Sequence, residues 1–157
     1  MTHPIPAEWS PHRAMWVGWP SHAELWGEDF AKAQDEVEAL VRALAGQGRE
    51  NVKLMVGNDE ALSGARARLE GVDGVEVVAG RFGDIWLRDT GPIFNAGSKT
   101  AQTFSFNGWG GKYDYPHDDE VADQIAAFSG VPTTRHDFIL EGGALDHDGE
   151  GTVLTTR

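Results

Sequence analysis

Apolar residues recur at steps of three and four between residues 28 and 47 of this chain. They are Phe30, Ala33, Val37, Leu40, Val41 and Leu44. This spacing puts them on one face and predicts an amphipathic helix, which Gly46 is expected to end. A second helix is expected from Asn58, whose side chain can cap the first turn, to about Glu70.

Runs rich in β-branched and aromatic residues separate the predicted helices. The predicted strands cover residues 13–19, 51–56, 75–79, 100–106 and 133–138. A third helix, capped by Asp118 or Asp119, is expected to run through Phe128. A hairpin should follow the last strand, because Asp148-Gly149 is a turn pair between extended runs. Strands that alternate with helices in this way predict an α/β fold.

The end of the chain is unusual for a finished domain. Residues 153–157 lie within or just after a predicted strand, with no polar tail or closing helix to cover its edge. An uncovered strand edge invites pairing with another chain. We therefore expect a single domain that is truncated after Arg157, and self-association into a homo-oligomer is a possible consequence.

Composition narrows the classes of partner. The 157 residues are 40% hydrophobic with six Trp and seven Phe, which is typical of a folded globule. A formal charge of −12 argues against nucleic acid and anionic membranes, and it suits a cationic substrate. No apolar run approaches the roughly 20 residues of a membrane span, and no signal peptide is visible, so the cytoplasm is the expected compartment. The chain has no cysteine, which excludes disulfides.

Two segments carry the candidate chemistry. Asp84–Pro92 and Glu141–Thr152 each place a carboxylate beside an aromatic ring or a glycine pair. Two carboxylates can accept paired N–H bonds from one guanidinium, and an indole face can cover its plane. The two segments therefore predict a site for a flat cation.

Metal and nucleotide sites are not expected. The six histidines are scattered without the spacing of a zinc site. Asp146–Gly149 lacks the third acidic position and the terminal Glu of a calcium loop, so we interpret it as a hairpin turn. No phosphate-binding glycine loop is present, and the sequence implies no cofactor.

Five segments in this order resemble the agmatine deiminase family, within the superfamily that also holds arginine deiminase and the peptidylarginine deiminases. They are Pro6–Trp9, Trp16–Pro20, Asp84–Pro92, Phe104–Tyr113 and Glu141–Thr152. The resemblance implies a propeller-like α/β barrel, the pentein fold, built from five ββαβ units around a central site. Residues 1–157 would supply the N-terminal part, about the first two units. The family's His-x-Asp segment and nucleophilic cysteine would lie beyond Arg157.

The resemblance also implies a reaction. The complete protein would hydrolyse agmatine to N-carbamoylputrescine and ammonia through a covalent amidino-cysteine intermediate, a step of putrescine biosynthesis and polyamine metabolism. Residues 1–157 alone are predicted to be inactive because they lack the cysteine.

The family pattern assigns roles in the Asp84–Pro92 segment. Asp89 would bind the guanidinium nitrogens, or alternatively cap the turn before Gly91. Trp86 would stack on the guanidinium plane, or pack in the core. Asp84 would face the amino tail of agmatine, or cap its own loop. Arg88 is expected to order neighbouring carboxylates through an ion pair.

The later segments supply two more candidates. Glu141 would accept guanidinium N–H bonds and take part in proton handling, with the glycine pair after it allowing close backbone approach to the ligand; otherwise it is a strand-end residue facing water. Residues 107–113 form a predicted glycine-rich loop, either a rim over the site with Trp109 in contact with substrate, or a surface loop packed by its own aromatic rings.

Two other functions are compatible with the residues. One is a non-catalytic module that binds polyamines or sugars on a tryptophan platform. The other is hydrolysis of arginine, dimethylarginine or peptidylarginine. The free carboxylate of arginine and dimethylarginine would favour an arginine pair aimed into the site.

Overall fold

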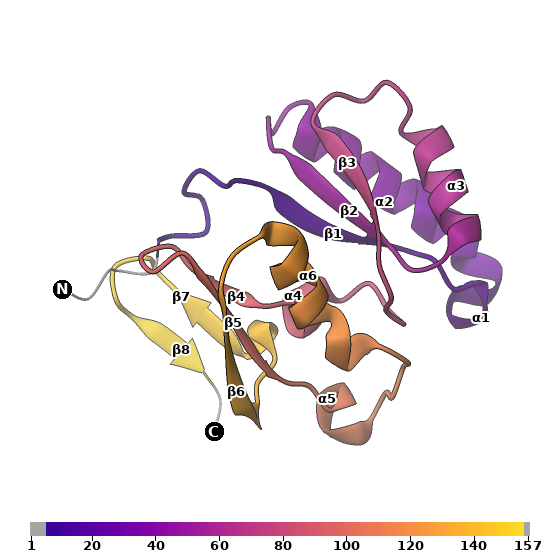
Figure 1. Ribbon diagram of the computed structural model, residues 1–157. Helices are drawn as coiled ribbons and strands as arrows, with labels where there is room; N and C mark the ends of the chain where they lie inside the picture. Colours follow the sequence, from indigo (N-terminus) through magenta and orange to yellow (C-terminus); the bar gives the residue numbers. More distant parts are fainter. Residues whose placement is uncertain (1–5, 156–157) are drawn as a thin grey trace. The chain divides into compact units, whose positions relative to one another are not determined.

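The computed structural model describes residues 6–155, and these form two compact units (Figure 1). The first unit is His12–Leu87, and the second combines the described parts of Met1–Pro11 and Arg88–Arg157. Each unit is described by itself below.

The first unit is a parallel sheet with helices between its strands. Its elements are β1 (Met15–Trp19), α1 (Ala23–Trp26), η1 (Gly27–Asp29), α2 (Phe30–Ala45), β2 (Val52–Val56), α3 (Asp59–Arg68) and β3 (Val75–Ala79). The strand order is β1-β2-β3, and both pairings are parallel. The three predicted strands, the long helix and the helix capped by Asn58 are confirmed. Asn58 accepts a hydrogen bond from the N–H of Ala61 at 2.9 Å.

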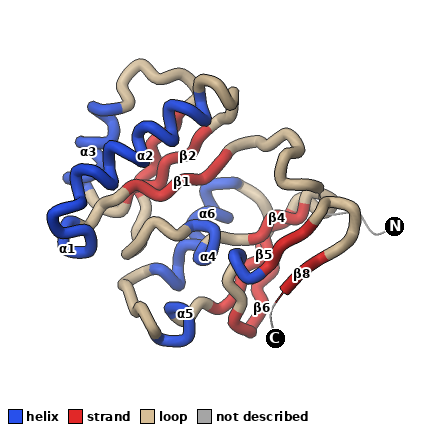
Figure 2. The backbone as a smooth tube through the Cα atoms, turned by 180° about the vertical axis from the view of Figure 1, so that it is seen from behind, coloured by secondary structure: helices blue, strands red, loops and turns tan. Residues whose placement is uncertain are grey.

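The core of the first unit lies between the sheet and helices α2 and α3. Val52, Leu54 and Val56 alternate along β2, so their side chains share one face. They form one buried cluster with residues of both helices, including Val41 and Ala65. Figure 2 shows the two helices on the same side of the sheet.

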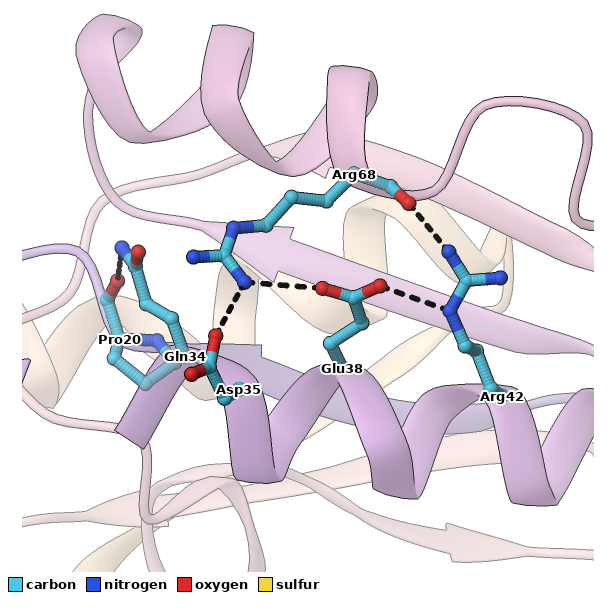
Figure 3. A network of polar contacts seen from close by, with 6 residues as sticks. All are labelled: Pro20, Gln34, Asp35, Glu38, Arg42 and Arg68. Atoms are coloured by element: carbon cyan, nitrogen blue, oxygen red, sulfur yellow. Dashed lines mark hydrogen bonds and ion pairs between the residues drawn. The ribbon is translucent and has the colours of Figure 1, made fainter. Parts of the chain in front are cut away.

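An ion-pair network joins the two helices on the outside of this core (Figure 3). Arg68 of α3 donates to Asp35 at 2.7 Å and to Glu38 at 3.0 Å, both on α2. Arg42 donates through Nε to Glu38 at 2.9 Å and through Nη2 to the carbonyl of Arg68 at 2.6 Å. The hydrogen bonds from Arg42 and then Arg68 lower the pKa of Glu38.

The second unit contains a mixed sheet and a separate hairpin. Its elements are α4 (Leu87–Thr90, which begins at the unit boundary), β4 (Ile93–Asn95), β5 (Thr100–Ser105), α5 (Gly108–Gly111), η2 (Asp118–Glu120), α6 (Val121–Ser129), β6 (Thr133–Ile139), η3 (Gly142–Ala144), β7 (Leu145–His147) and β8 (Val153–Thr155). Strand β5 pairs antiparallel with β4 and parallel with β6, and β7 pairs antiparallel with β8.

The order β4-β5-α6-β6 is the ββαβ arrangement that the family resemblance predicts. The antiparallel pair β7–β8 follows this ββαβ arrangement, which itself begins with the antiparallel pair β4–β5. The first unit differs, because its three strands are all parallel and a helix separates each from the next.

Several sequence predictions need correction. Residues 87–90 form the helical turn α4 and residues 93–95 form β4, and neither element was predicted. Both elements span too few residues for a periodic pattern to show. Helix α6 begins at Val121, and neither Asp118 nor Asp119 caps it, because they lie in the 3-10 turn η2 before it. The ends Met1–Ile5 and Thr156–Arg157 lie outside the described residues.

Candidate functional site

The carboxylate of Asp89 is held by two donors from distant parts of the second unit. Its Oδ1 accepts a hydrogen bond from the backbone N–H of Gly143 at 3.0 Å. Its Oδ2 accepts one from the indole Nε1–H of Trp109 at 3.1 Å. Asp89 is half-buried on α4. An ionised carboxylate offers about four lone-pair sites, so two further N–H donors can be accepted.

The two glycines after Glu141 are explained by their contact with α4. A Cβ atom on Gly142 would overlap the carbonyl oxygen of Arg88, and one on Gly143 would overlap Oδ1 of Asp89. The glycine pair was expected to let the backbone approach a ligand. In the structure it lets the backbone approach the Asp89 segment.

Glu141 itself comes immediately before η3. Its backbone is extended (φ −89°, ψ 137°), and its carbonyl accepts a hydrogen bond from Ala144 N–H at 3.0 Å. The side chain is half-buried and makes no hydrogen bond or ion pair to other residues in the described part of the chain. Glu141 therefore lies two residues from the N–H that binds Asp89, with its carboxylate available to a donor.

Arg88 makes the ion pair that the sequence predicts, and its partner is Glu8. The Nη2 and Oε1 atoms are 2.8 Å apart, and the same Nη2 donates to the carbonyl of Leu145, the first residue of β7, at 3.3 Å. Arg88 thus links the segment around residue 8 and the start of the hairpin to the α4 turn. Both side chains of the ion pair are more than half exposed, so its electrostatic contribution to stability is small.

The segment 107–113, predicted as a glycine-rich loop, is a left-handed turn. Residues 108–111 all have positive φ, between 55° and 78°. Trp109 is the one residue of the four that carries a side chain, with φ 55° and ψ 49°. An L-residue in this conformation costs about 1–2 kcal/mol. Within the segment, the ring of Tyr113 packs against the Trp109 ring at 6.0 Å, as one of the two alternatives expects. Phe106, just before the segment, packs against the same ring at 5.0 Å.

Asp84 and Trp86 belong to the first unit, after the carboxyl end of β3. Asp84 accepts hydrogen bonds from the backbone N–H of Ile85 at 2.7 Å and from the indole N–H of Trp86 at 2.9 Å. The local bond to Ile85 is the loop-capping role considered for Asp84. Trp86 is 55% exposed, so it is not a core residue of this chain.

Residue identity alone did not reveal which donors hold Asp89. The two donors stand 20 and 54 residues away along the chain, and one of them is a backbone N–H. No sequence pattern marks such a pairing. Gly143, the second glycine of the pair, gave a partial indication of this contact, because a glycine pair often marks a close backbone approach.

The Asp148-Gly149 turn of the β7–β8 hairpin is confirmed. Oδ1 of Asp148 accepts the N–H groups of Glu150 at 2.7 Å and of Thr152 at 3.1 Å. Hydrogen bonds from the Thr152 side chain, and then from these backbone groups, lower the pKa of Asp148 from 3.8 to about 2. Across residues 6–155, no group of three or more His, Asp or Glu side chains is arranged to hold a metal ion. Within the same range, none of the helices has the length and apolar character needed to cross a bilayer.

Comparison with known proteins places the whole chain in one family. The family described as Porphyromonas-type peptidyl-arginine deiminase matches residues 4–157. The agmatine deiminase of Stutzerimonas stutzeri (strain A1501) is 37% identical over 162 aligned residues, which cover 98% of this chain and 43% of that protein. The chain thus spans less than half the length of this curated relative.

Solved structures agree with the sequence relatives. The agmatine deiminase of Enterococcus faecalis matches with a TM-score of 0.82 at 29% identity, covering 97% of this chain and 43% of that one. A cysteine-to-serine variant of C. jejuni agmatine deiminase with substrate bound matches with a TM-score of 0.83 at 27% identity, covering 97% and 44%. These likenesses confirm the predicted α/β fold of the deiminases.

Proposed function

The chain belongs to the Porphyromonas-type peptidyl-arginine deiminase family, and we propose that the complete protein hydrolyses agmatine to N-carbamoylputrescine and ammonia. Residues 1–157 are then the N-terminal part of one deiminase domain that continues past Arg157. In this role the protein serves putrescine and polyamine synthesis in the cytoplasm. Agmatine deiminases at 37% identity over nearly the whole chain support this choice of substrate.

The proposal rests mainly on the Asp89 carboxylate, which two hydrogen bonds hold in a fixed orientation. A guanidinium stays protonated at neutral pH, so the enzyme must bind a planar cation and present its carbon for attack. Gly143 and Trp109 each fix one oxygen of Asp89 and leave lone pairs for substrate N–H groups. Glu141, beside Gly143, supplies the second carboxylate.

The covalent steps use a cysteine that this chain does not contain. A cysteine thiolate from the remainder of the protein attacks the guanidinium carbon and forms a C–S bond. A proton is delivered to one terminal nitrogen, and the C–N bond to that nitrogen breaks. Ammonia departs, and an amidino-thioether remains on the enzyme. Water then adds to that carbon and gives up its two protons, one to the group that had protonated the leaving nitrogen and one to solvent. The C–S bond breaks, and N-carbamoylputrescine departs as the thiolate is restored. The substrate-bound cysteine-to-serine relative supports this use of a thiolate.

Within this scheme the chain supplies binding and electrostatic stabilisation. Asp89 and Glu141 hold the cation as it approaches the transition state. We assign Trp86 the role that the family pattern implies, stacking on the guanidinium plane. We assign Asp84, by the same family pattern, to the ammonium end of the substrate.

The test is to sequence the coding DNA past Arg157 and express the complete protein. Ammonia and N-carbamoylputrescine are then measured with agmatine, and with arginine as the comparison substrate. We expect turnover of agmatine, a loss of several orders of magnitude in Asp89→Asn, and no ammonia from residues 1–157 alone. Preference for arginine, or turnover by the cysteine-free chain, would contradict the proposal.

A further inference from the structure

We propose that Trp109 is a positioning residue, which fixes the orientation of the Asp89 carboxylate through its indole N–H instead of contacting the substrate. The inference rests on the proposed function of Asp89 as the acceptor of guanidinium N–H bonds. It replaces the expectation that the Trp109 ring forms part of a rim around the substrate.

The first argument is the fixed direction of the indole N–H. The Trp109 ring meets Phe106 edge-on, with centroids 5.0 Å apart and planes at 87°. Tyr113 meets it at 6.0 Å and 81°. Two edge-to-face contacts restrict rotation of the ring. The single polar atom of the indole therefore points at one place, and Oδ2 of Asp89 lies there at 3.1 Å.

The second argument is the backbone that carries the ring. Trp109 has a left-handed conformation that side chains seldom adopt, and it is kept there by its neighbours. The Asn107 side chain accepts from Gly110 N–H at 2.9 Å, and Gly111 N–H donates to the Asn107 carbonyl at 2.7 Å. Position 108 has no room for a residue larger than glycine, because a Cβ atom there would overlap the carbonyl oxygen of Tyr113.

The third argument concerns what the hydrogen bond achieves. Gly143 binds one oxygen of Asp89 and Trp109 binds the other, so together they define the plane of the carboxylate. Paired N–H bonds from a guanidinium require both oxygens to lie in a set plane. Removal of the indole donor frees the carboxylate to rotate about its terminal bond.

The test uses Trp109→Phe in the complete protein, since Phe keeps an aromatic ring and deletes only the indole N–H and ring area. Trp9→Phe is the matched control, because it makes the same change at a side chain that is 81% exposed. Agmatine affinity is measured by calorimetry for both variants, for Asp89→Asn, and for the double variant of Trp109 and Asp89. The indole N–H resonance of Trp109 is followed by NMR in the wild type and in Asp89→Asn.

We expect Trp109→Phe to weaken agmatine binding about 10- to 100-fold, the range for a hydrogen bond to a charged group, and Trp9→Phe to leave it unchanged. In protein that already carries Asp89→Asn, the Trp109 change should cost less than about twofold, as a double-mutant cycle requires for coupled residues. The Trp109 indole resonance should shift in Asp89→Asn without agmatine present.

Two results would overturn the inference while leaving the proposed function intact. The first is an active wild type in which Trp109→Phe has the same effect with and without Asp89→Asn. The second is an indole resonance that does not respond to Asp89→Asn. By contrast, a wild type that neither binds nor hydrolyses agmatine would refute the proposed function, and the NMR measurement would still decide the Trp109–Asp89 relationship.

Discussion

The backbone N–H of Gly143 donates to Oδ1 of Asp89 over a distance of 3.0 Å, although 54 residues separate them in the chain. This bond joins the two acidic segments of the sequence into one arrangement. The first segment supplies the carboxylate, and the second supplies a donor that orients it. Glu141 lies close to the same donor because it is two residues before Gly143 in the chain.

Replacement of Gly143 by alanine tests this relationship directly. A Cβ atom at that position would overlap Oδ1 of Asp89, so either the carboxylate or the η3 turn must move. A misplacement on the order of 1 Å costs about 100-fold in rate. We therefore expect kcat/KM of the complete protein for agmatine to fall about 100-fold in steady-state assays of ammonia release.

Gly64→Ala is the control for that substitution. Gly64 lies on α3 with no neighbour within 4 Å of an added Cβ atom. Alanine at an exposed helical position is expected to stabilise the fold by up to about 1 kcal/mol and to leave activity unchanged. Equal activity in the Gly143 and Gly64 variants would contradict the role given to Gly143.

Arg68 is expected to contribute more to stability than its partial exposure suggests. Its guanidinium pairs with Asp35 and Glu38 of α2, and it lies 6.0 Å from the centroid of the buried Trp19 ring. Arg68→Met should lower the free energy of unfolding by about 1–2 kcal/mol, because a network and a stacking contact are lost together. Urea unfolding followed by tryptophan fluorescence measures the difference.

Arg66→Met is the matched control for Arg68. Arg66 is an exposed residue two positions earlier on the same helix, and no hydrogen bond or ion pair of its side chain occurs among residues 6–155. Its replacement is expected to change the unfolding free energy by less than about 0.5 kcal/mol. Similar losses in both variants would show that the ion-pair network is not the cause.

Glu38 is expected to make stability depend on acid pH. Hydrogen bonds from Arg42 and Arg68 lower the pKa of Glu38 in the folded chain below its ordinary value of 4.5. A lowered pKa gives stability that is fully present above 4.5 and is lost as pH falls through the folded pKa. Glu38→Gln should therefore be less stable than wild type at pH 7, with the gap closing below pH 4.5 in urea titrations. A gap that is constant from pH 7 to pH 2.5 would refute this.

Asp148 is expected to keep the β7–β8 turn closed in acid. Its pKa is lowered from 3.8 to about 2 by the Thr152 side chain and the backbone N–H groups of Glu150 and Thr152. The contribution to stability is complete above pH 3.8 and is lost as pH falls toward 2. A ¹³C NMR titration of the Asp148 carboxyl carbon should give a midpoint near 2, whereas a midpoint near 3.8 would mean that the turn is open in solution.

Local chemistry was sufficient to predict α2, α3 and the three strands of the first unit, but not the short elements α1 and η1. The apolar spacing of residues 30–44 predicts α2, and Asn58 predicts the start of α3, because amphipathic periodicity and capping depend on neighbours within one or two turns. The strands β2 and β3 were also identified from their β-branched residues. The β7–β8 turn follows in the same way from Asp148-Gly149.

The tertiary structure decided how the candidate site is assembled. The sequence alone determined the residue types that suit a guanidinium, and it singled out Asp89 and Glu141. Only the folded chain pairs Asp89 with Trp109 and Gly143, because these donors lie 20 and 54 residues from Asp89 in the sequence. The Gly143 donor is also a backbone N–H group, which no residue type identifies. The left-handed turn at Trp109 likewise depends on neighbours that hold an unfavourable backbone conformation in place, and no local preference of tryptophan predicts it.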